Sequence, residues 1–373
     1  MKPIFAIPAT AALVYRAWSR QSLTPLGIAV AVATAIAHAV HPWSIFFSLL
    51  VVFFLSGTAA TKVKHDIKLR LTQSSDGTPG GGPRTHVQVI ANSIVASILI
   101  LLHAWNLHEH PAGPHASGGA TCWARESDVL VVGIVANYAA VAADTFSSEL
   151  GILSKSQPRM ITAPWRVVPP GTNGGVTSVG LLAGLLGSFV VSLTAVLLLP
   201  FCDGTTVFSP NSTWDATSKL AFLISMSLVG LGGSLLDSFL GSLLQASVVD
   251  TRTGRVIEGS GGKKVPVHSE GSTHIKQRAK LRSHVVNNGE GKQRVAQTSA
   301  VSPSEGAKSR AGVEAGSIVP EDGEHRESRR VNTGYDVLSN NGVNLLMAAT
   351  MSLVAMGGAC WVWDYHPYIE MLS

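Results

Sequence analysis

Three acidic residues lie within or at the edge of apolar segments: Asp144, Glu149 and Asp237. Carboxylates inside a membrane are costly and are therefore functional candidates. Asp144 belongs to ADTFSSELG and Asp237 to LDSFLGSLL, so Thr or Ser and then Phe follow each aspartate. Carboxylates from two helices can hold a Mg²⁺ ion that also binds substrate phosphates. We therefore predict that all three residues are catalytic and that Asp144 and Asp237 are metal ligands.

A Gly- and Asn-rich motif follows each aspartate-containing segment along the chain. The motifs are GTNGGVT at 171–177 and SNNGVN at 339–344. Glycines at a helix start leave backbone N–H groups free to approach an anion, which the helix dipole also favours. The same residues are common helix caps and turn formers, so a structural role is the alternative. The phosphate-binding candidates in these motifs are Asn173, Gly174, Asn341 and Asn344.

A third motif, GGGPRTHVQVIAN at 80–92, precedes another apolar segment. If its last part is helical, Arg84, Gln88 and Asn92 are four residues apart and share one face. Lys155 and Arg159 are expected on the same side of the membrane and, with Arg84, could neutralise phosphate charge. We add these five residues to the predicted substrate site.

The segments that carry these residues are those of a membrane protein. Residues 250–335 contain 15 basic and 10 acidic residues, whereas the other 287 positions contain only 13 of each sign. The formal net charge of +5 therefore comes entirely from one stretch. A mean hydropathy of +0.28 that includes so polar a stretch excludes an ordinary soluble domain.

Eight apolar segments predict an all-α, polytopic membrane helix bundle of about seven or eight spans. The first is the weakest because Pro3 directly precedes it and Pro8 lies within it, and a signal peptide is its alternative. The two aspartate-containing hairpins have the same orientation, which predicts a parallel internal repeat. The expected segments are Ile4–Tyr15, Leu23–Val40, Trp43–Ser56, Val87–Leu102, Val129–Ala143, Val176–Leu199, Leu220–Val249 and Val343–Val362.

The distribution of Lys and Arg between the loops predicts the orientation of the chain. With the N-terminus exoplasmic, 25 of the 28 basic residues lie in cytoplasmic loops, and only Lys2, Arg125 and Lys219 lie outside. Two further features fall on the exoplasmic side. Asn211 begins a glycosylation sequon, and Cys122 and Cys202 lie in loops where a disulfide could persist, although free thiols are the alternative.

We divide the chain into three parts: a membrane domain at 1–257, a basic cytoplasmic loop at 258–333, and a last span with a short exoplasmic tail at 334–373. The loop has almost no aromatic residues, so we expect it to be disordered. It is either a solvated spacer or a segment that lies on anionic lipid headgroups through residues such as Lys263 and Lys264. Four histidines between His103 and His115 are expected to lie in a loop without a metal site.

The sequence over 143–188, which contains DTFSSELG, SKSQPRMIT and GTNGGVT, resembles the transmembrane protein 19 family, long described as a domain of unknown function. The similarity continues through GGGPR, DSFLGSLLQ and SNNGVN and covers nearly all the chain outside 258–333. Phe146 replaces the usual Trp, residues 81–85 read Gly-Gly-Pro-Arg-Thr where the family usually has Gly-Gly-Gln-Arg-Asn, and the cytoplasmic insertion is longer than typical.

One branch of that family resembles a plastid phytyl-phosphate kinase, a transferase that passes a phosphate from a nucleoside triphosphate to a prenyl monophosphate. The resemblance implies metal- or phosphate-binding roles for Asp144, Glu149, Asn173, Asp237 and Asn341. The leading hypothesis is therefore a prenyl-phosphate kinase that uses Mg²⁺ and CTP or ATP, with membrane lipids as partners and no nucleic acid. A transporter and a non-catalytic membrane scaffold are the alternatives. The sequon makes the endoplasmic reticulum the expected location.

Overall fold

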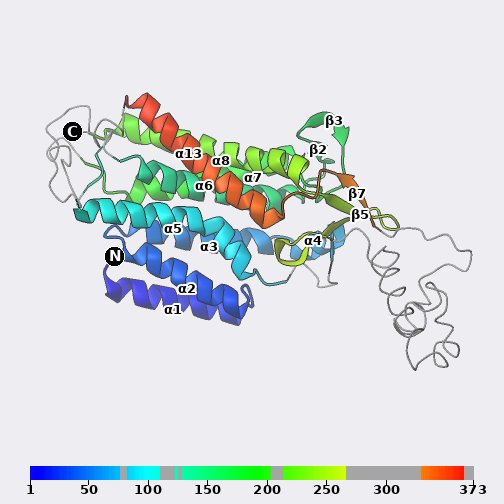
Figure 1. Ribbon diagram of the computed structural model, residues 1–373, viewed down its shortest axis with the longest axis horizontal. Coiled ribbons are helices and arrows are strands. Elements are labelled where there is room, and N and C mark those ends of the chain that lie inside the picture. Colours follow the sequence, from blue (N-terminus) through cyan, green and yellow to red (C-terminus); the bar gives the residue numbers. More distant parts are fainter. Residues whose placement is uncertain (76–81, 110–121, 125–127, 203–212, 266–328, 365–373) are drawn as a thin grey trace, which may run out of the picture.

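The computed structural model describes residues 1–75, 82–109, 122–124, 128–202, 213–265 and 329–364. These residues form a bundle of long helices with two small sheets at one end (Figure 1). The apolar helices are α1 (Pro3–Ser19), α2 (Pro25–Val40), α3 (Ile45–Lys62), α5 (His86–Glu109), α6 (Leu130–Gly151), α7 (Ser178–Leu198), α8 (Ala216–Leu244) and α13 (Asn340–Val362). Six of them, α3, α5, α6, α7, α8 and α13, are long and apolar enough to cross a bilayer. The predicted multi-pass helical fold is confirmed.

Helix α6 is the centre of the bundle and packs against α3, α5, α7, α8 and α13. Small residues allow its neighbours to approach closely. A Cβ atom added at Gly230 would lie 2.4 Å from the Ser188 Cβ atom, and one added at Gly233 would lie 2.5 Å from the Ala140 Cβ atom. Membrane helices commonly pack through such small residues because the backbones can then come close. This packing brings α6 and α8, which carry the two aspartates, side by side.

The Gly- and Asn-rich motifs lie at helix starts, as expected. The Thr177 hydroxyl accepts a hydrogen bond from the Gly180 N–H (3.0 Å) at the start of α7, and the Ser339 hydroxyl accepts one from the Gly342 N–H (3.3 Å) at the start of α13. Each aspartate helix is thus followed by short strands and then by a capped helix, in the order α6 to α7 and α8 to α13. Both hairpins turn at the same end of the bundle (Figure 1).

The strands at that end belong to two small sheets that the sequence did not predict. One sheet has the order β1-β6-β5-β7 and the other β3-β2-β4, and the short helix α4 (His65–Leu71) lies at the same end (Figure 1). The strands are β1 (Gln73–Ser74), β2 (Arg159–Met160), β3 (Ala163–Val167), β4 (Gly175–Val176), β5 (Ser247–Asp250), β6 (Val256–Glu258) and β7 (Arg329–Thr333).

Two predicted boundaries are corrected by these strands. The seventh apolar segment was expected to reach Val249, but α8 ends at Leu244 and the next apolar residues form β5. The loop expected to be disordered from residue 258 to 333 contributes β7 and a short turn of 3₁₀ helix, η3 (Ser260–Gly262). Backbone pairing with β5 explains why the polar residues of β7 form a strand. Residues 266–328 lie outside the described part.

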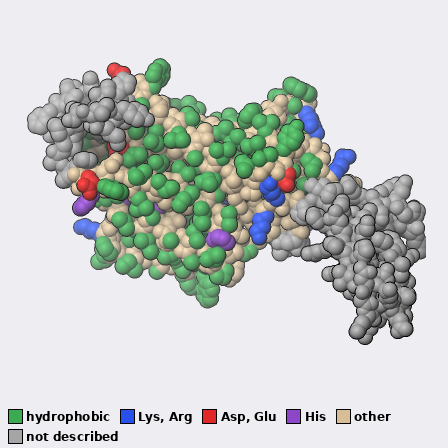
Figure 2. Space-filling view, viewed as in Figure 1, with side chains coloured by type: hydrophobic (Ala, Val, Ile, Leu, Met, Phe, Trp, Pro, Cys, Tyr) green, Lys and Arg blue, Asp and Glu red, His purple; other side chains and the backbone are tan. Residues whose placement is uncertain are grey.

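The first apolar segment forms α1, which contains Pro8 and packs against α2. Its spanning of the membrane stays a prediction. Figure 2 shows hydrophobic side chains over the middle of the bundle and several Lys and Arg side chains at the end that carries the strands. This separation matches an integral membrane protein whose polar site lies at one end of the bundle.

Candidate functional site

A cavity of about 750 Å³ lies at the strand-bearing end of the bundle. Its volume falls within the range of about 300–1,000 Å³ that is typical of small-molecule sites. Helices α4, α6 and α8 contribute to its wall, as do β6 and the turns that precede α5, α7 and α13. Seven of the predicted site residues line it, namely Asp144, Glu149, Asp237, Arg84, Gln88, Asn173 and Gly174.

Asp144 and Asp237 face each other across the contact between α6 and α8. Their half-buried side chains line the cavity and lie close enough to share a hydrogen bond. The close approach of Gly233 to Ala140 sets this register, since Asp237 and Asp144 each lie four residues further along their helices. Neither carboxylate forms an ion pair with a described Lys, Arg or His residue. Adjacent carboxyl groups of this kind require a shared proton or a bound cation.

Glu149 belongs to a separate network on the α3 side of the cavity. Its carboxylate accepts hydrogen bonds from Lys68 Nζ (2.8 Å) and from the Thr61 hydroxyl (3.0 Å). Arg84 Nη2 also donates to the Thr61 hydroxyl oxygen (3.1 Å). Two cations and one carboxylate therefore lie together on this wall, which gives it an excess of positive charge.

The backbone holds Arg84 in position before α5 begins. The Arg84 N–H donates to the Ser22 carbonyl oxygen (3.0 Å), and the Thr24 N–H donates to the Arg84 carbonyl oxygen (3.0 Å). Burial lowers the pKa of the Arg84 guanidinium, while the nearby Glu149 carboxylate acts in the opposite direction. An arginine whose ordinary pKa is so high stays protonated at neutral pH, so Arg84 offers the cavity a fixed positive charge.

Gln88, Asn92 and Asn344 connect the cavity to the helices behind it. The Gln88 side chain lines the cavity, and its Oε1 atom accepts a hydrogen bond from the Thr85 N–H (2.8 Å). The Asn344 amide nitrogen is 3.4 Å from Asn92 Oδ1; with the amide rotated, it donates to Asp237 Oδ1 at 3.3 Å. Asn92 and Asn344 are not among the cavity-lining residues, so Asn344 contacts Asp237 from behind the cavity wall and Asn92 contacts Asn344.

Asn173 and Gly174 line the cavity from the loop that precedes β4. The Asn173 N–H donates to the Ser247 hydroxyl (3.0 Å), which fixes the loop against the start of β5. Gly174 has φ of +79°, and an added Cβ atom would lie 2.4 Å from the Ser242 Cβ atom. Only glycine fits this position, because a side chain would face both a strained backbone and a clash with α8.

Besides Asn92 and Asn344, three more of the predicted phosphate-binding residues lie away from the cavity wall. Lys155 and Arg159 are exposed and do not line the cavity; Arg159 Nη1 donates to the Pro164 carbonyl oxygen (2.9 Å) because the sheet of β2 and β3 carries it outward. Asn341 is buried, and its Nδ2 atom donates to the Gly261 carbonyl oxygen (2.9 Å). Asn341 therefore positions the turn at η3, which does line the cavity.

The sequence reasoning missed several cavity residues. Lys68 was considered only as one of the basic residues of the cytoplasmic loops. Lys263 and Lys264 were expected to lie on lipid headgroups or in a solvated spacer. All three line the cavity. Lys264 also pairs with the exposed Asp336 (3.2 Å). One signal was available: the sequence GSGGKK at 259–264 places two lysines directly after clustered glycines.

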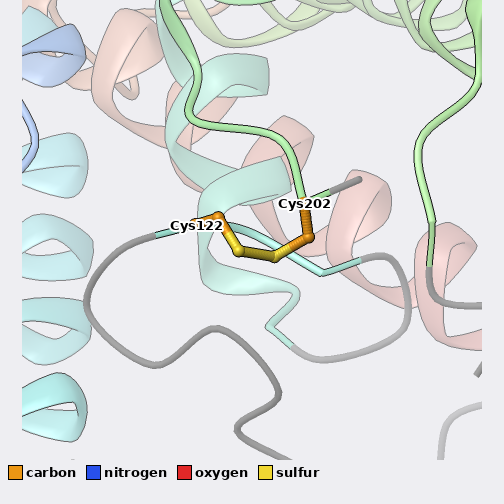
Figure 3. Close-up of a disulfide and its surroundings, with 2 residues drawn as sticks. All are labelled: Cys122 and Cys202. Carbon is orange, nitrogen blue, oxygen red and sulfur yellow. A yellow bond between two sulfur atoms is a disulfide. The ribbon is translucent and has the colours of Figure 1, made fainter. Parts of the chain in front are cut away.

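At the opposite end of the bundle, the structure joins Cys122 and Cys202 in a disulfide (Figure 3). The pair links the residues before α6 to those after α7. Cys360 is a free thiol within α13. The predicted glycosylation site, Asn211, lies outside the described residues.

His103 is not a loop histidine, contrary to the prediction. It lies buried in α5, where its Nδ1 atom is 2.7 Å from His41 Nε2 and its Nε2 atom is 3.2 Å from Asp128 Oδ2. His41 Nδ1 accepts the Trp43 N–H, so its Nε2 carries the proton and donates to His103. Burial lowers the pKa of His41 to about 3 and raises that of Asp128 to about 6. His108 is exposed, whereas His110 and His115 lie outside the described residues.

Comparison with known proteins identifies the family. The model of the integral membrane protein family DUF92 matches residues 8–352. The chain belongs to this family. The resemblance found in the sequence motifs is thus confirmed, as is the multi-pass membrane character.

Three relatives of the DUF92 chain show how far the similarity extends. It is 36% identical to Protein PGR of Arabidopsis thaliana over 65% of this chain and 79% of that protein. It is 30% identical to Protein VTE6, chloroplastic, of the same plant over 41% of this chain and 40% of that protein. An uncharacterized membrane protein of Methanocaldococcus jannaschii, MJ0933, is 28% identical over 54% of this chain and 65% of its own length. No solved structure matches the chain.

Proposed function

We propose that this protein is a phosphotransferase that acts on a prenyl or related lipid phosphate, with CTP or ATP as the donor. The pair of Asp144 and Asp237 on the wall of the cavity carries this proposal, because adjacent carboxylates beside basic residues suit a metal-bound phosphate. The resemblance to a family with a phytyl-phosphate kinase branch supports the substrate class. Membership of the DUF92 family alone does not specify a reaction.

The paired aspartates fit Mg²⁺. This ion is usually held by one or two carboxylates, with substrate phosphates and water as its remaining ligands. Asp144 and Asp237 would supply the two carboxylates. No group of three or more His, Cys, Asp or Glu side chains suited to a metal occurs in the described ranges, which agrees with a site that needs the substrate for completion. When bound, the ion would neutralise charge on the transferring phosphoryl group.

The basic residues of the cavity would bind and orient the phosphates. Arg84 offers a guanidinium fixed by its backbone, and Lys68 can exchange its Glu149 partner for a phosphate oxygen. In the reaction, the bond between the terminal phosphorus of the donor and its bridging oxygen breaks while a bond to an oxygen of the prenyl monophosphate forms. The products are a prenyl diphosphate and a nucleoside diphosphate. Such a transfer needs positioning and charge neutralisation but no protein nucleophile.

The position of the cavity suits a lipid substrate. The cavity lies at the end of apolar helices, so a prenyl chain can remain in the bilayer while its phosphate reaches the carboxylates. We place this end on the cytoplasmic side from the excess of Lys and Arg in its loops, and we propose the endoplasmic reticulum as the location.

An assay of the purified protein tests the reaction. Radiolabelled CTP or ATP, Mg²⁺ and prenyl monophosphates of different lengths should yield a labelled prenyl diphosphate. We expect Asp144→Asn and Asp237→Asn each to lower kcat at least 100-fold, while the control Asp215→Asn, at the exposed N-cap of α8 away from the cavity, leaves it within twofold. Retention of full activity by both cavity variants would overturn the proposed roles of the aspartates.

Transport is the second candidate, and the two hairpins in parallel order favour it, because such repeats are common in transporters. The polar residues gather at one end of the bundle, which favours an enzyme. Uptake of a lipid phosphate or a small phosphate ester into proteoliposomes, without chemical change of that compound, would support transport instead.

A further inference from the structure

Helices α5, α6 and α13 meet along one line inside the bundle. An added Cβ atom at Gly133 of α6 would lie 2.5 Å from Met356 Sδ of α13 and 3.2 Å from Leu99 Cδ1 of α5. Because α5 and α13 run opposite to α6, four residues forward on α6 correspond to four residues back on each neighbour. We call this line the three-helix seam.

Polar residues recur along the three-helix seam. Gly133 is level with Met356 of α13 and Leu99 of α5. Counting four residues from this contact places Asn137 level with Ser352, and counting eleven places Asp144 level with Gln88. The contact between Asn92 and Asn344 (3.4 Å) lies between these two levels, and in its other orientation the Asn344 amide nitrogen donates to Asp237 Oδ1 (3.3 Å). The seam therefore continues inward from the cavity and ends at Asn137 and Ser352, near the middle of the helices.

The innermost pair lacks hydrogen-bond partners in the part of the chain that the structure describes. Asn137 is 0% exposed and Ser352 is 1% exposed. Neither the Asn137 amide nitrogen, nor its oxygen, nor the Ser352 hydroxyl has a hydrogen-bond partner among the described residues. A buried polar group without a hydrogen-bond partner has lost its hydration and gained nothing in return, so these side chains would destabilise the fold if nothing were bound to them. Apolar residues of similar size would pack here without that cost.

We propose that the three-helix seam binds water, with its innermost site between Asn137 and Ser352. An amide that both donates and accepts, together with a hydroxyl, matches a water molecule, which commonly bridges otherwise unsatisfied buried groups. Water at this site would extend the hydrogen bonds of Asn92 and Asn344 into the bundle. The pair of Asp144 and Asp237 would then be hydrated from inside as well as from the cavity, whatever reaction the cavity performs.

Radiolytic hydroxyl-radical labelling of the purified protein tests this site, since radicals formed from bound water oxidise neighbouring side chains. Met347 of α13 is the reporter: it is 0% exposed, and an added Cβ atom at Gly233 would contact both Met347 Sδ (3.4 Å) and Ala140 of α6, which lies three residues after Asn137. Met226 in α8, 6% exposed and part of the apolar core, is the reference. We expect oxidation of Met347 to be at least fivefold faster than that of Met226.

Variants separate bound water from other routes of oxidation. Asn137→Leu should lower the rate at Met347 severalfold and leave the rate at Met226 unchanged. Ser352→Ala removes a single oxygen atom and should act in the same direction if Asn137→Leu does not fold. Equal rates at Met347 and Met226 in the unmodified protein would overturn the proposal, as would an unchanged Met347 rate in a folded Asn137→Leu or Ser352→Ala variant.

Discussion

Asp144 and Asp237 lie side by side although they come from different hairpins, and their carboxyl groups are close enough to share a hydrogen bond. Packing of Gly233 on Ala140 sets this relationship, one helical turn before each aspartate. A substitution at Gly233 should therefore disturb the site without touching a carboxylate. We expect Gly233→Leu to lower activity at least tenfold, whereas Gly357→Leu in α13, where an added Cβ atom meets nothing within 4 Å, should leave it within twofold. Equal activities of the two variants in the phosphotransferase assay would contradict this account.

The ion pair between Lys68 and Glu149 should contribute measurably to stability. Its side chains are 11% and 25% exposed, so water screens the pair weakly. A double-mutant cycle with Lys68→Met and Glu149→Gln should give a coupling energy of about 1–2 kcal/mol in denaturant unfolding. The exposed pair of Lys264 and Asp336, at 42% and 58%, is the control and should give less than about 0.5 kcal/mol. Similar couplings for both pairs would show that burial does not decide their strength.

The disulfide between Cys122 and Cys202 should stabilise the end of the bundle opposite the cavity. Its cysteines are separated by 80 residues, for which loss of chain entropy in the unfolded state predicts about 4 kcal/mol. We expect Cys122→Ser to lower the Tm by several degrees and dithiothreitol to have no further effect on that variant. Cys360→Ser should leave the Tm unchanged. If Cys122→Ser melts at the same temperature as the unmodified protein, the bridge does not stabilise the fold.

The raised pKa of Asp128 predicts a dependence of stability on pH. The folded protein holds a proton on Asp128 up to about pH 6, whereas the unfolded chain releases it near 3.8. This carboxyl group therefore makes the fold less stable as the pH rises from about 4 to 6. Asp128→Asn mimics the protonated form and still offers an oxygen to His103. It should match the unmodified protein near pH 4 and be more stable by about 3 kcal/mol above pH 6.

Thermal unfolding at several pH values checks this sign. The lowered pKa of His41 makes the fold more stable as the pH rises, which is the opposite direction. His41 is present in both proteins, so its contribution cancels in the difference between their stabilities. A constant difference in Tm between Asp128→Asn and the unmodified protein from pH 4 to 7 would contradict the prediction.

The sequence was sufficient to predict the helices and part of the site, because apolar length and rare acidic residues are local signals. It located the segments of α6 and α8 and the aspartates that line the cavity. The pairing of Lys68 with Glu149 could not be predicted from the sequence, because nothing in the sequence of α4 indicates which distant helix Lys68 contacts. The strands are only two to five residues long and too short for an alternating pattern. Asn341 was predicted to bind phosphate because an asparagine amide can donate hydrogen bonds. In the structure, its Nδ2 atom donates to the Gly261 carbonyl oxygen instead.

Direct binding of a divalent cation tests the central claim that Asp144 and Asp237 form a metal site. Mn²⁺ can replace Mg²⁺ and is measured by electron paramagnetic resonance on the purified protein, with and without a prenyl monophosphate. We predict one Mn²⁺ per chain, bound more tightly with the phosphate, and a loss of affinity of at least tenfold in Asp144→Asn and in Asp237→Asn. The same affinity in both variants and in the unmodified protein would contradict the account.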